Sequence, residues 1–150
     1  MELPEGRTDA GFVIALRHTS GVVSNVESTK INHVAVRELR AYGSAGSYRS
    51  SGTDVQAQSI FAGRRPAANP DEWGYEPPDH WGVLATAAGE HRVPSEPGRY
   101  HDLYTQFARA VKGDGPQPVP AAEGIRTLEV LDAARLSDRE GRTVDIVTSR

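Results

Sequence analysis

The sequence predicts an α+β fold in which helices pack on one face of an open, mostly antiparallel β-sheet. In the first half of the chain, short runs of alternating apolar and polar residues are separated by glycines. In the second half, two longer segments repeat their apolar residues with helical spacing. Because 150 residues is a usual length for one core, we expect a single domain that covers residues 1–150.

Two hairpins are expected first. Apolar residues alternate over residues 12–26 on either side of a turn at Gly21. A second hairpin is predicted over residues 34–50, where "VAVRELRAYG" is followed by "SAG" and "SYRS". Its turn glycines, Gly43 and Gly46, are suited to positive φ angles. Neither face of these strands is wholly apolar, so one surface of the sheet is expected to face water or a partner.

A short helix and a long irregular segment are expected next. The helix begins at Thr53 or Asp54, which are both good N-caps, and it ends at Gly63. Residues 64–82 are rich in proline, and loops of this length tend to be functional or mobile. A third hairpin is predicted over residues 81–94.

Two helices and a strand complete the predicted fold. The segment "YHDLYTQFARAV", residues 100–111, carries one apolar stripe that is expected to cover the sheet, and Gly113 ends this helix. A second helix with a broad apolar face runs from Ala121 to a cap at Gly141. The segment "TVDIV", residues 143–147, predicts a short closing strand.

Charge and composition argue against several classes of partner. The formal net charge is −3, so there is no electrostatic reason to expect nucleic acid or an anionic membrane surface as a partner. The sequence has no cysteine, which excludes disulfides, thiolate metal sites and cysteine nucleophiles. No apolar run is long enough to span a bilayer and no targeting signal is visible, so a cytoplasmic location is expected.

No motif predicts a catalytic, cofactor-binding or metal-binding residue. The G-x-G at residues 113–115 follows a predicted helix, and Pro118 lacks the N–H that a phosphate-binding turn needs. The five histidines include no H-x-x-x-H pair, and no G-x-S-x-G turn marks a nucleophile. A Ser/His/Asp arrangement stays open, because its members need not be close in sequence.

The proline-rich segment contains candidates for ligand contact. Trp73 and Trp81 are suited to stack on a sugar ring, and Glu76 and Asp79 to accept hydrogen bonds from hydroxyl groups. An independent hydrolase or a lectin-like domain would use such a loop. In the alternative interpretation, the two tryptophans anchor the loop to the core.

Three stretches share their order and spacing with one family of proteins. The stretch "EPGRYHDLYTQFARAVKGDGPQPVPAAEGIRTLEVLDAARLSDREGRTVDI" combines a Tyr-x-x-x-Tyr/Phe helix, a Gly/Pro turn and a helix end of the type A-a-r-S-x-x-x-G. The stretch "RELRAYGSAGSYRSSGTDVQ" is a glycine-bearing strand pair that leads into G-x-D-x-Q, and "ALRHTSGVVSNV" is the hairpin before it. Together they resemble the Gfo/Idh/MocA oxidoreductases (glucose-fructose oxidoreductase, inositol dehydrogenase and relatives) over residues 9–147.

The resemblance implies the C-terminal domain of an NAD(P)-dependent sugar or polyol oxidoreductase, which supplies an open sheet for substrate contact and for homodimer formation. In the family, a preceding Rossmann domain binds NAD or NADP and carries a catalytic lysine in Glu-Lys-Pro, and an Asp-x-x-x-His motif follows. Neither motif occurs here, since Lys30 and Lys112 are the only lysines and neither precedes proline. The chain alone is therefore not expected to be catalytic, and a cofactor is expected only together with the missing Rossmann domain.

The resemblance also implies three substrate-contacting residues. Asp54 and Gln56 match the family's Asp-x-Gln, and Arg49 lies on the strand that leads to it, although Val55 stands where relatives often have proline. In the alternative interpretation, Asp54 is a helix N-cap and Gln56 a surface residue. The alternative function is a stand-alone, non-catalytic binding or assembly module derived from this domain.

Overall fold

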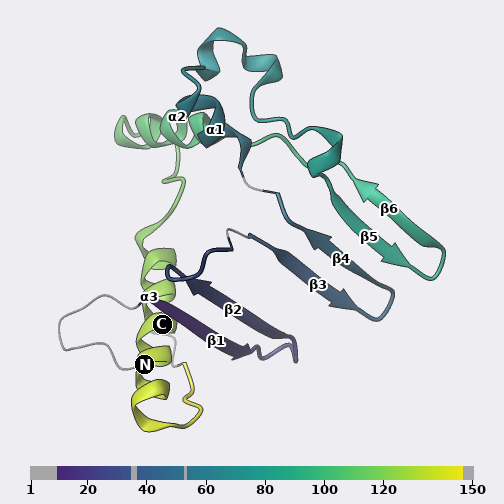
Figure 1. Ribbon diagram of the computed structural model, residues 1–150. Helices are drawn as coiled ribbons and strands as arrows, with labels where there is room; N and C mark the ends of the chain where they lie inside the picture. The colour runs from purple at the N-terminus through teal and green to yellow at the C-terminus, as the bar shows by residue number, and fades with distance from the viewer. Residues whose placement is uncertain (1–9, 35–36, 53, 147–150) are drawn as a thin grey trace. The chain divides into compact units, whose positions relative to one another are not determined.

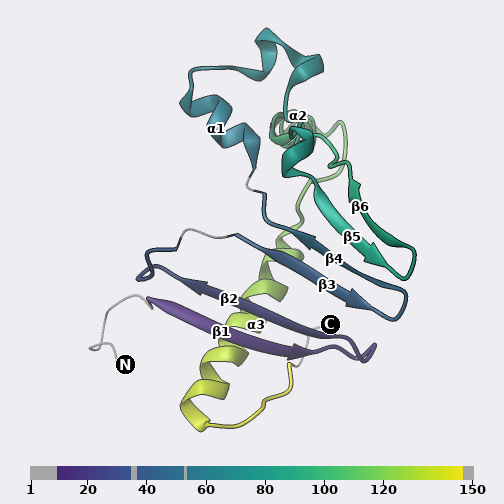
Figure 2. The ribbon, with the colours of Figure 1, turned by 45° about the vertical axis from the view of Figure 1, so that its right-hand side comes forward.

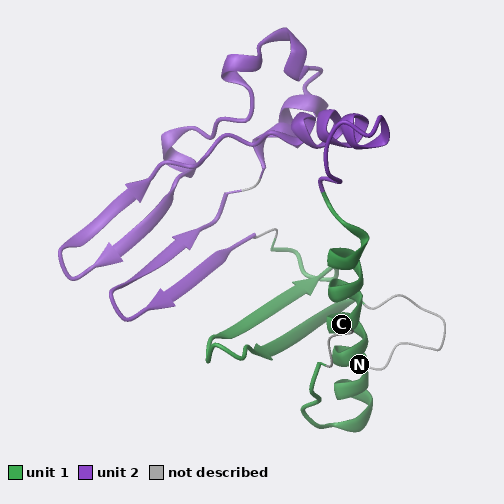
Figure 3. Cartoon of the chain, turned by 180° about the vertical axis from the view of Figure 1, so that it is seen from behind, with its two compact units in different colours: residues 1–35, 119–150 green, residues 36–118 purple. Residues whose placement is uncertain are grey.

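The computed structural model describes residues 10–34, 37–52 and 54–146 (Figure 1). These residues form two antiparallel sheets and three α-helices, so the predicted α+β fold class is confirmed. The chain divides into two compact units, residues 1–35 with 119–150 and residues 36–118 (Figure 3). This division does not test the expectation of a single domain, which stays a prediction.

The first unit contains the first predicted hairpin. Strand β1 (Gly11–Arg17) pairs in antiparallel register with β2 (Val23–Thr29). The turn between them depends on Gly21, whose φ of 87° is favourable only for glycine and whose N–H donates to the carbonyl of His18 over 2.9 Å. The hairpin therefore forms where the alternating pattern predicts it.

The last helix packs against this hairpin. Helix α3 (Ala121–Glu140) lies along one face of β1 and β2 (Figure 2), and Gly141 ends it in the left-handed conformation. A cavity of about 320 Å³ remains between α3 and four consecutive residues of β1, Val13 to Leu16. The predicted packing of a helix on a sheet face is thus present in this unit.

The predicted closing strand at residues 143–147 is wrong over its described part. Thr143, Val144 and Ile146 belong to an irregular segment without strand pairing, and Val147 lies outside the described residues. These three residues line the cavity between α3 and β1. Their apolar alternation thus reflects side-chain contact with the helix and hairpin rather than a place in a sheet.

The second unit contains a four-stranded antiparallel sheet with the strands in sequence order. Each strand pairs with the next along the chain, as in two consecutive hairpins joined by the proline-rich loop. The four strands are β3 (Leu39–Gly43), β4 (Gly46–Ser50), β5 (Gly82–Thr86) and β6 (Gly89–Val93).

Strand β3 is shorter than predicted. The pattern predicts a strand from residue 34, but pairing begins at Leu39, which lies opposite Ser50 at the end of β4. Residues 35–36 lie outside the described part of the chain, and the described residues 34, 37 and 38 have no strand pairing. The length of β3 is therefore limited by its partner strand, which the alternating pattern does not encode.

The glycines of the second hairpin serve a different purpose from the predicted one. Neither Gly43 nor Gly46 has a positive φ. A Cβ at Gly46 would lie 2.7 Å from the carbonyl oxygen of Ala85 on the neighbouring strand. Glycine at position 46 therefore permits the close approach of β5, and the expectation of positive φ at both glycines is wrong.

One helix precedes the proline-rich loop of residues 64–82, and a second follows the hairpin of β5 and β6. Helix α1 (Val55–Phe61) begins after Asp54, while Thr53, the other predicted cap, lies outside the described residues. Helix α2 (Tyr100–Val111) has the predicted bounds. Its apolar stripe is exposed, with 73% of Tyr104 accessible, so the expectation that this stripe covers the sheet is not met within the chain.

The buried part of the second unit lies where α1, the loop and α2 meet. Trp73 is 7% exposed and Gln56 is 2% exposed, and they are the only buried large side chains among the described residues. The indole nitrogen of Trp73 donates to the amide oxygen of Gln56 over 3.1 Å. A polar contact therefore lies at the centre of this small core, and a cavity opens beside it.

Candidate functional site

A cavity of about 320 Å³ in the second unit is the candidate site. It lies where the end of β4, the start of α1, the loop and the start of α2 come together. A concave surface with a few converging polar groups is the usual form of a small-molecule site. The polar residues of its lining include Arg37, Asp54, Glu76, Ser95, Glu96 and Tyr100.

Asp54 combines a structural role with a place in the cavity. Its carboxylate accepts a hydrogen bond from the N–H of Gln56 over 2.8 Å, so the predicted N-cap is confirmed. Burial raises the pKa of this carboxyl, but hydrogen bonds from Tyr100 and Gln56 and the charge of Arg37 outweigh burial and hold the pKa below its ordinary value. Asp54 therefore presents an ionised carboxylate to the cavity at neutral pH.

Gln56 lies in the wall of the cavity and is almost completely buried. Its amide oxygen accepts from Trp73 Nε1 over 3.1 Å and from the main-chain N–H of Tyr100 over 3.0 Å. Its amide nitrogen donates to both carboxylate oxygens of Asp54, over 3.1 and 3.3 Å. The interpretation of Gln56 as a surface residue is therefore wrong.

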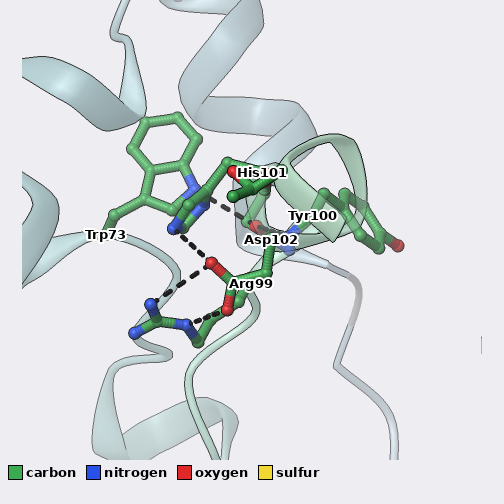
Figure 4. A network of polar contacts seen from close by, with 7 residues as sticks. Trp73, Arg99, Tyr100, His101 and Asp102 are labelled. Atoms are coloured by element: carbon green, nitrogen blue, oxygen red, sulfur yellow. Dashed lines mark hydrogen bonds and ion pairs between the residues drawn. The ribbon is translucent and has the colours of Figure 1, made fainter. Parts of the chain in front are cut away.

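The first turn of α2 carries a polar network beside Trp73 (Figure 4). Arg99 donates to both oxygens of Asp102, over 2.6 and 3.3 Å, which closes a bidentate ion pair. This pair lowers the pKa of Asp102. Nε2 of His101 lies 3.4 Å from the same carboxylate. The network holds the helix start that contributes Tyr100 to the cavity.

Glu76 of the loop and Ser95 of the link between β6 and α2 form another part of the cavity wall. Ser95 donates its hydroxyl proton to Glu76 over 2.6 Å. The main-chain oxygen of Glu76 accepts from Trp81 Nε1 over 3.1 Å. Trp81 thus anchors the loop segment that carries Glu76, and it does not itself line the cavity.

Of the five predicted contact residues, the structure brings two to the cavity. Asp54 and Gln56 line it, whereas Trp73 is buried and neither Trp73 nor Trp81 belongs to the cavity lining. Arg49 is exposed on β4, where its guanidinium lies 4.0 Å from Glu90 of the neighbouring hairpin. No ligand contact is thereby assigned or excluded, and the five roles stay predictions.

Sequence reasoning missed several residues of the lining. Arg37 precedes β3 in a segment that was expected to continue the strand. Ser95 and Glu96 stand between two prolines, directly before a helix. Polar residues in a proline-bounded link before a helix could have been recognised as candidates for the cavity lining, because the prolines restrict where their side chains lie.

The G-x-G motif and the possible metal ligands can be compared with the structure over its described residues. The G-x-G of residues 113–115 connects α2 to α3, so no strand precedes it, and Pro116 and Pro118 offer no N–H to a phosphate. No group of three or more His, Asp or Glu side chains in the described part of the chain is arranged to hold a metal ion. Likewise, none of its helices is long and apolar enough to cross a membrane.

Comparisons with known proteins agree on one family. The family model described as "Oxidoreductase family, C-terminal alpha/beta domain" matches residues 2–146. The scyllo-inositol 2-dehydrogenase (NADP(+)) IolW of Bacillus subtilis is 33% identical over 107 residues, which cover 69% of this chain and 29% of that protein. The uncharacterized oxidoreductase YdgJ of Escherichia coli is 37% identical over 95 residues, which cover 61% of this chain and 26% of YdgJ.

A solved structure supports the same assignment of fold. The Bacillus subtilis protein YvaA superposes with a TM-score of 0.82 at 25% identity, over 98% of this chain and 43% of YvaA. The chain therefore spans under a third of IolW and of YdgJ and less than half of YvaA.

Proposed function

Because the chain belongs to the oxidoreductase family of the Gfo/Idh/MocA type, as its C-terminal alpha/beta domain, we propose that it is the substrate-contacting and dimerisation domain of an NAD(P)-dependent sugar or polyol oxidoreductase. The observation that carries the proposal is the cavity beside the starts of α1 and α2, whose lining contains three carboxylates and one guanidinium group. The name of the relative IolW indicates a cyclic polyol as its substrate class.

The chemistry of the cavity suits a polyhydroxylated ligand. Hydroxyl groups donate to carboxylates such as Asp54, Glu76 and Glu96, and their oxygens accept from a guanidinium such as that of Arg37. Because Asp54 has a lowered pKa, it acts as an acceptor over the whole neutral range. Such a site distinguishes hydroxyl positions by the direction of each hydrogen bond.

The proposal leaves the nucleotide and the proton transfer to residues outside the chain. In support, the G-x-G of residues 113–115 follows helix α2 rather than a strand, and neither lysine of the sequence lies in a Glu-Lys-Pro motif. The domain's own contribution is to bind and orient the substrate. Such binding energy serves catalysis when it places the reacting carbon against the nicotinamide.

Binding of scyllo-inositol to the chain tests the first part of the proposal. We expect saturation-transfer NMR to show binding with a dissociation constant on the order of 1 mM. Glu96→Gln is expected to weaken it about tenfold, because a hydrogen bond to a charged group is worth about 1.5–3 kcal/mol. The matched control is Glu123→Gln, an exposed carboxylate on α3 outside the cavity, which should bind as the wild type does. Absence of saturation transfer, or equal effects of the two variants, contradicts the proposal.

The second part of the proposal is a homodimer formed through the open face of the four-stranded sheet. The register places Arg40, Arg49 and Val83 on the same face, because they lie opposite one another on adjacent strands. Tyr42 shares this face, lies two positions from Arg40 and is 76% exposed. A sheet face that carries both apolar and charged side chains is typical of a subunit interface, whereas a face buried in a domain core is mainly apolar.

Sedimentation of the chain tests the dimer. We expect a dimer mass at tens of micromolar, roughly the range for an interface of about 800 Å² per partner. Tyr42→Glu is expected to yield a monomer, because it places a charge on the proposed interface in place of an exposed aromatic ring. Tyr104→Glu on α2, which is similarly exposed, is the control and should leave the dimer intact. A wild type that sediments only as a monomer argues against the interface.

A further inference from the structure

Gln56 is the one buried polar side chain among the described residues, and each end of its amide is engaged. We propose that Gln56 is a positioning residue, which holds three walls of the cavity in register and does not itself contact the ligand. The inference rests on the proposed function for the identity of the ligand. It differs from the expectation that Gln56 contacts the substrate directly.

The amide oxygen of Gln56 joins the loop to α2. It accepts from Trp73 of the loop and from the main-chain N–H of Tyr100, which is the first residue of the helix. The first N–H groups of a helix have no partner within it and are normally satisfied by a cap. Arg99, the N-cap residue of α2, makes no such side-chain hydrogen bond. Gln56 therefore supplies from α1 the cap that α2 lacks.

The amide nitrogen of Gln56 fixes the carboxylate that faces the cavity. It donates to both oxygens of Asp54, and the main-chain N–H of Gln56 donates to one of them over 2.8 Å. These contacts set the rotamer of Asp54 while part of its carboxylate stays on the cavity. Gln56 thus acts on two lining residues at once, Asp54 through its nitrogen and Tyr100 through its oxygen.

The packing around Gln56 restricts access to its amide, although the residue lies in the cavity wall. Gly98 lies so close that a Cβ there would overlap Nε2 of Gln56 and come within 2.9 Å of its Cδ. Gly98 is itself held by a hydrogen bond from its N–H to the carbonyl of Gly74 over 2.9 Å. With 2% of its surface exposed and both ends of its amide hydrogen-bonded, Gln56 has little left to offer a ligand directly, whereas the residues that it orients line the cavity.

Two substitutions at position 56 separate positioning from contact. Gln56→Met keeps the side-chain volume and removes every side-chain hydrogen bond. Gln56→Glu keeps an oxygen that can accept from Trp73 and Tyr100. It replaces the amide NH2, which donates to Asp54, with an oxygen, so two carboxyl groups then lie side by side. The control is Gln58→Met, which makes the same change at an exposed position of the same helix.

The readouts are the indole N–H resonances and the binding of scyllo-inositol, both by NMR. The sequence has two tryptophans, so a Trp81→Phe spectrum assigns the indole signal of Trp73. We expect Gln56→Met to shift that signal and the main-chain amide of Tyr100, and to weaken inositol binding about tenfold or more. We expect Gln56→Glu to leave the Trp73 signal near its wild-type position while it weakens binding, and Gln58→Met to change neither.

Each alternative has its own outcome. Weaker binding by Gln56→Met with unmoved Trp73 and Tyr100 signals shows direct ligand contact and overturns the positioning role. Moved signals with wild-type binding show a purely structural residue and overturn it as well. If the wild type does not bind scyllo-inositol, the proposed function fails, while the Trp73 and Tyr100 signals still decide whether Gln56 holds the cavity walls.

Discussion

Gly74→Ala is expected to destabilise the unit of residues 36–118 by about 2–5 kcal/mol, because the new methyl group meets both backbone strain and a steric clash. Gly74 has a φ of 80°, which a side chain disfavours. A Cβ there would overlap the carbonyl oxygen of Gly98 and lie 2.8 Å from its nitrogen. Since these are backbone atoms, no side-chain rotation relieves the overlap. Urea unfolding followed by tryptophan fluorescence measures the loss, because both tryptophans lie in this unit.

Gly63→Ala is the matched control for that prediction. Gly63 has a nearly identical φ of 81° and follows the end of α1, but a Cβ there meets nothing within 4 Å. The substitution therefore carries only the conformational cost, about 1–2 kcal/mol. A loss at position 74 no larger than at position 63 would show that the approach of Gly98 is not a tight constraint.

The parts of the fold that follow from local signals were predictable from the sequence. The apolar stripe of α2 gave its exact bounds, and the left-handed Gly141 ends α3 where a helix-stop signal stands. Hairpins were found from alternation because a strand's period of two is visible in a single segment. The predicted closing strand is wrong because apolar residues also recur in an irregular segment that faces a helix and a hairpin, as Thr143 and Val144 do where they line the cavity beside α3.

The candidate site depends on contacts that no local pattern contains. The amide oxygen of Gln56 accepts from residues 17 and 44 positions further along the chain. For Asp54 the sequence leaves a helix N-cap and a substrate contact as alternatives; the structure confirms the cap and also places Asp54 in the cavity lining, while the contact stays a prediction. Arg49 was predicted from its nearness to Asp54 in sequence, but the sheet register directs it to the face that carries Glu90. Sequence distance alone does not settle which side chains meet.

Trp73→Ala is expected to destabilise the same unit by about 3–5 kcal/mol, since it removes the largest buried apolar group of a small core. Trp73 is 7% exposed, and its loss also leaves the amide oxygen of Gln56 with one donor fewer. For a unit of this size the melting temperature falls roughly 4–8 °C per kcal/mol, so thermal unfolding followed by circular dichroism resolves the change easily.

Trp73→Phe and Trp81→Ala distinguish loss of the buried ring from loss of the indole hydrogen bond and from loosening of the loop. Trp73→Phe keeps an aromatic ring and removes the N–H, so we expect a smaller loss of about 1–2 kcal/mol. Trp81 is only partly buried and anchors the loop through one hydrogen bond, so its alanine variant should lie nearer the wild type than Trp73→Ala does. If Trp73→Ala instead keeps wild-type stability and loses inositol binding, the ring stacks on the ligand, and the loop is a ligand-binding element rather than the anchor of the core.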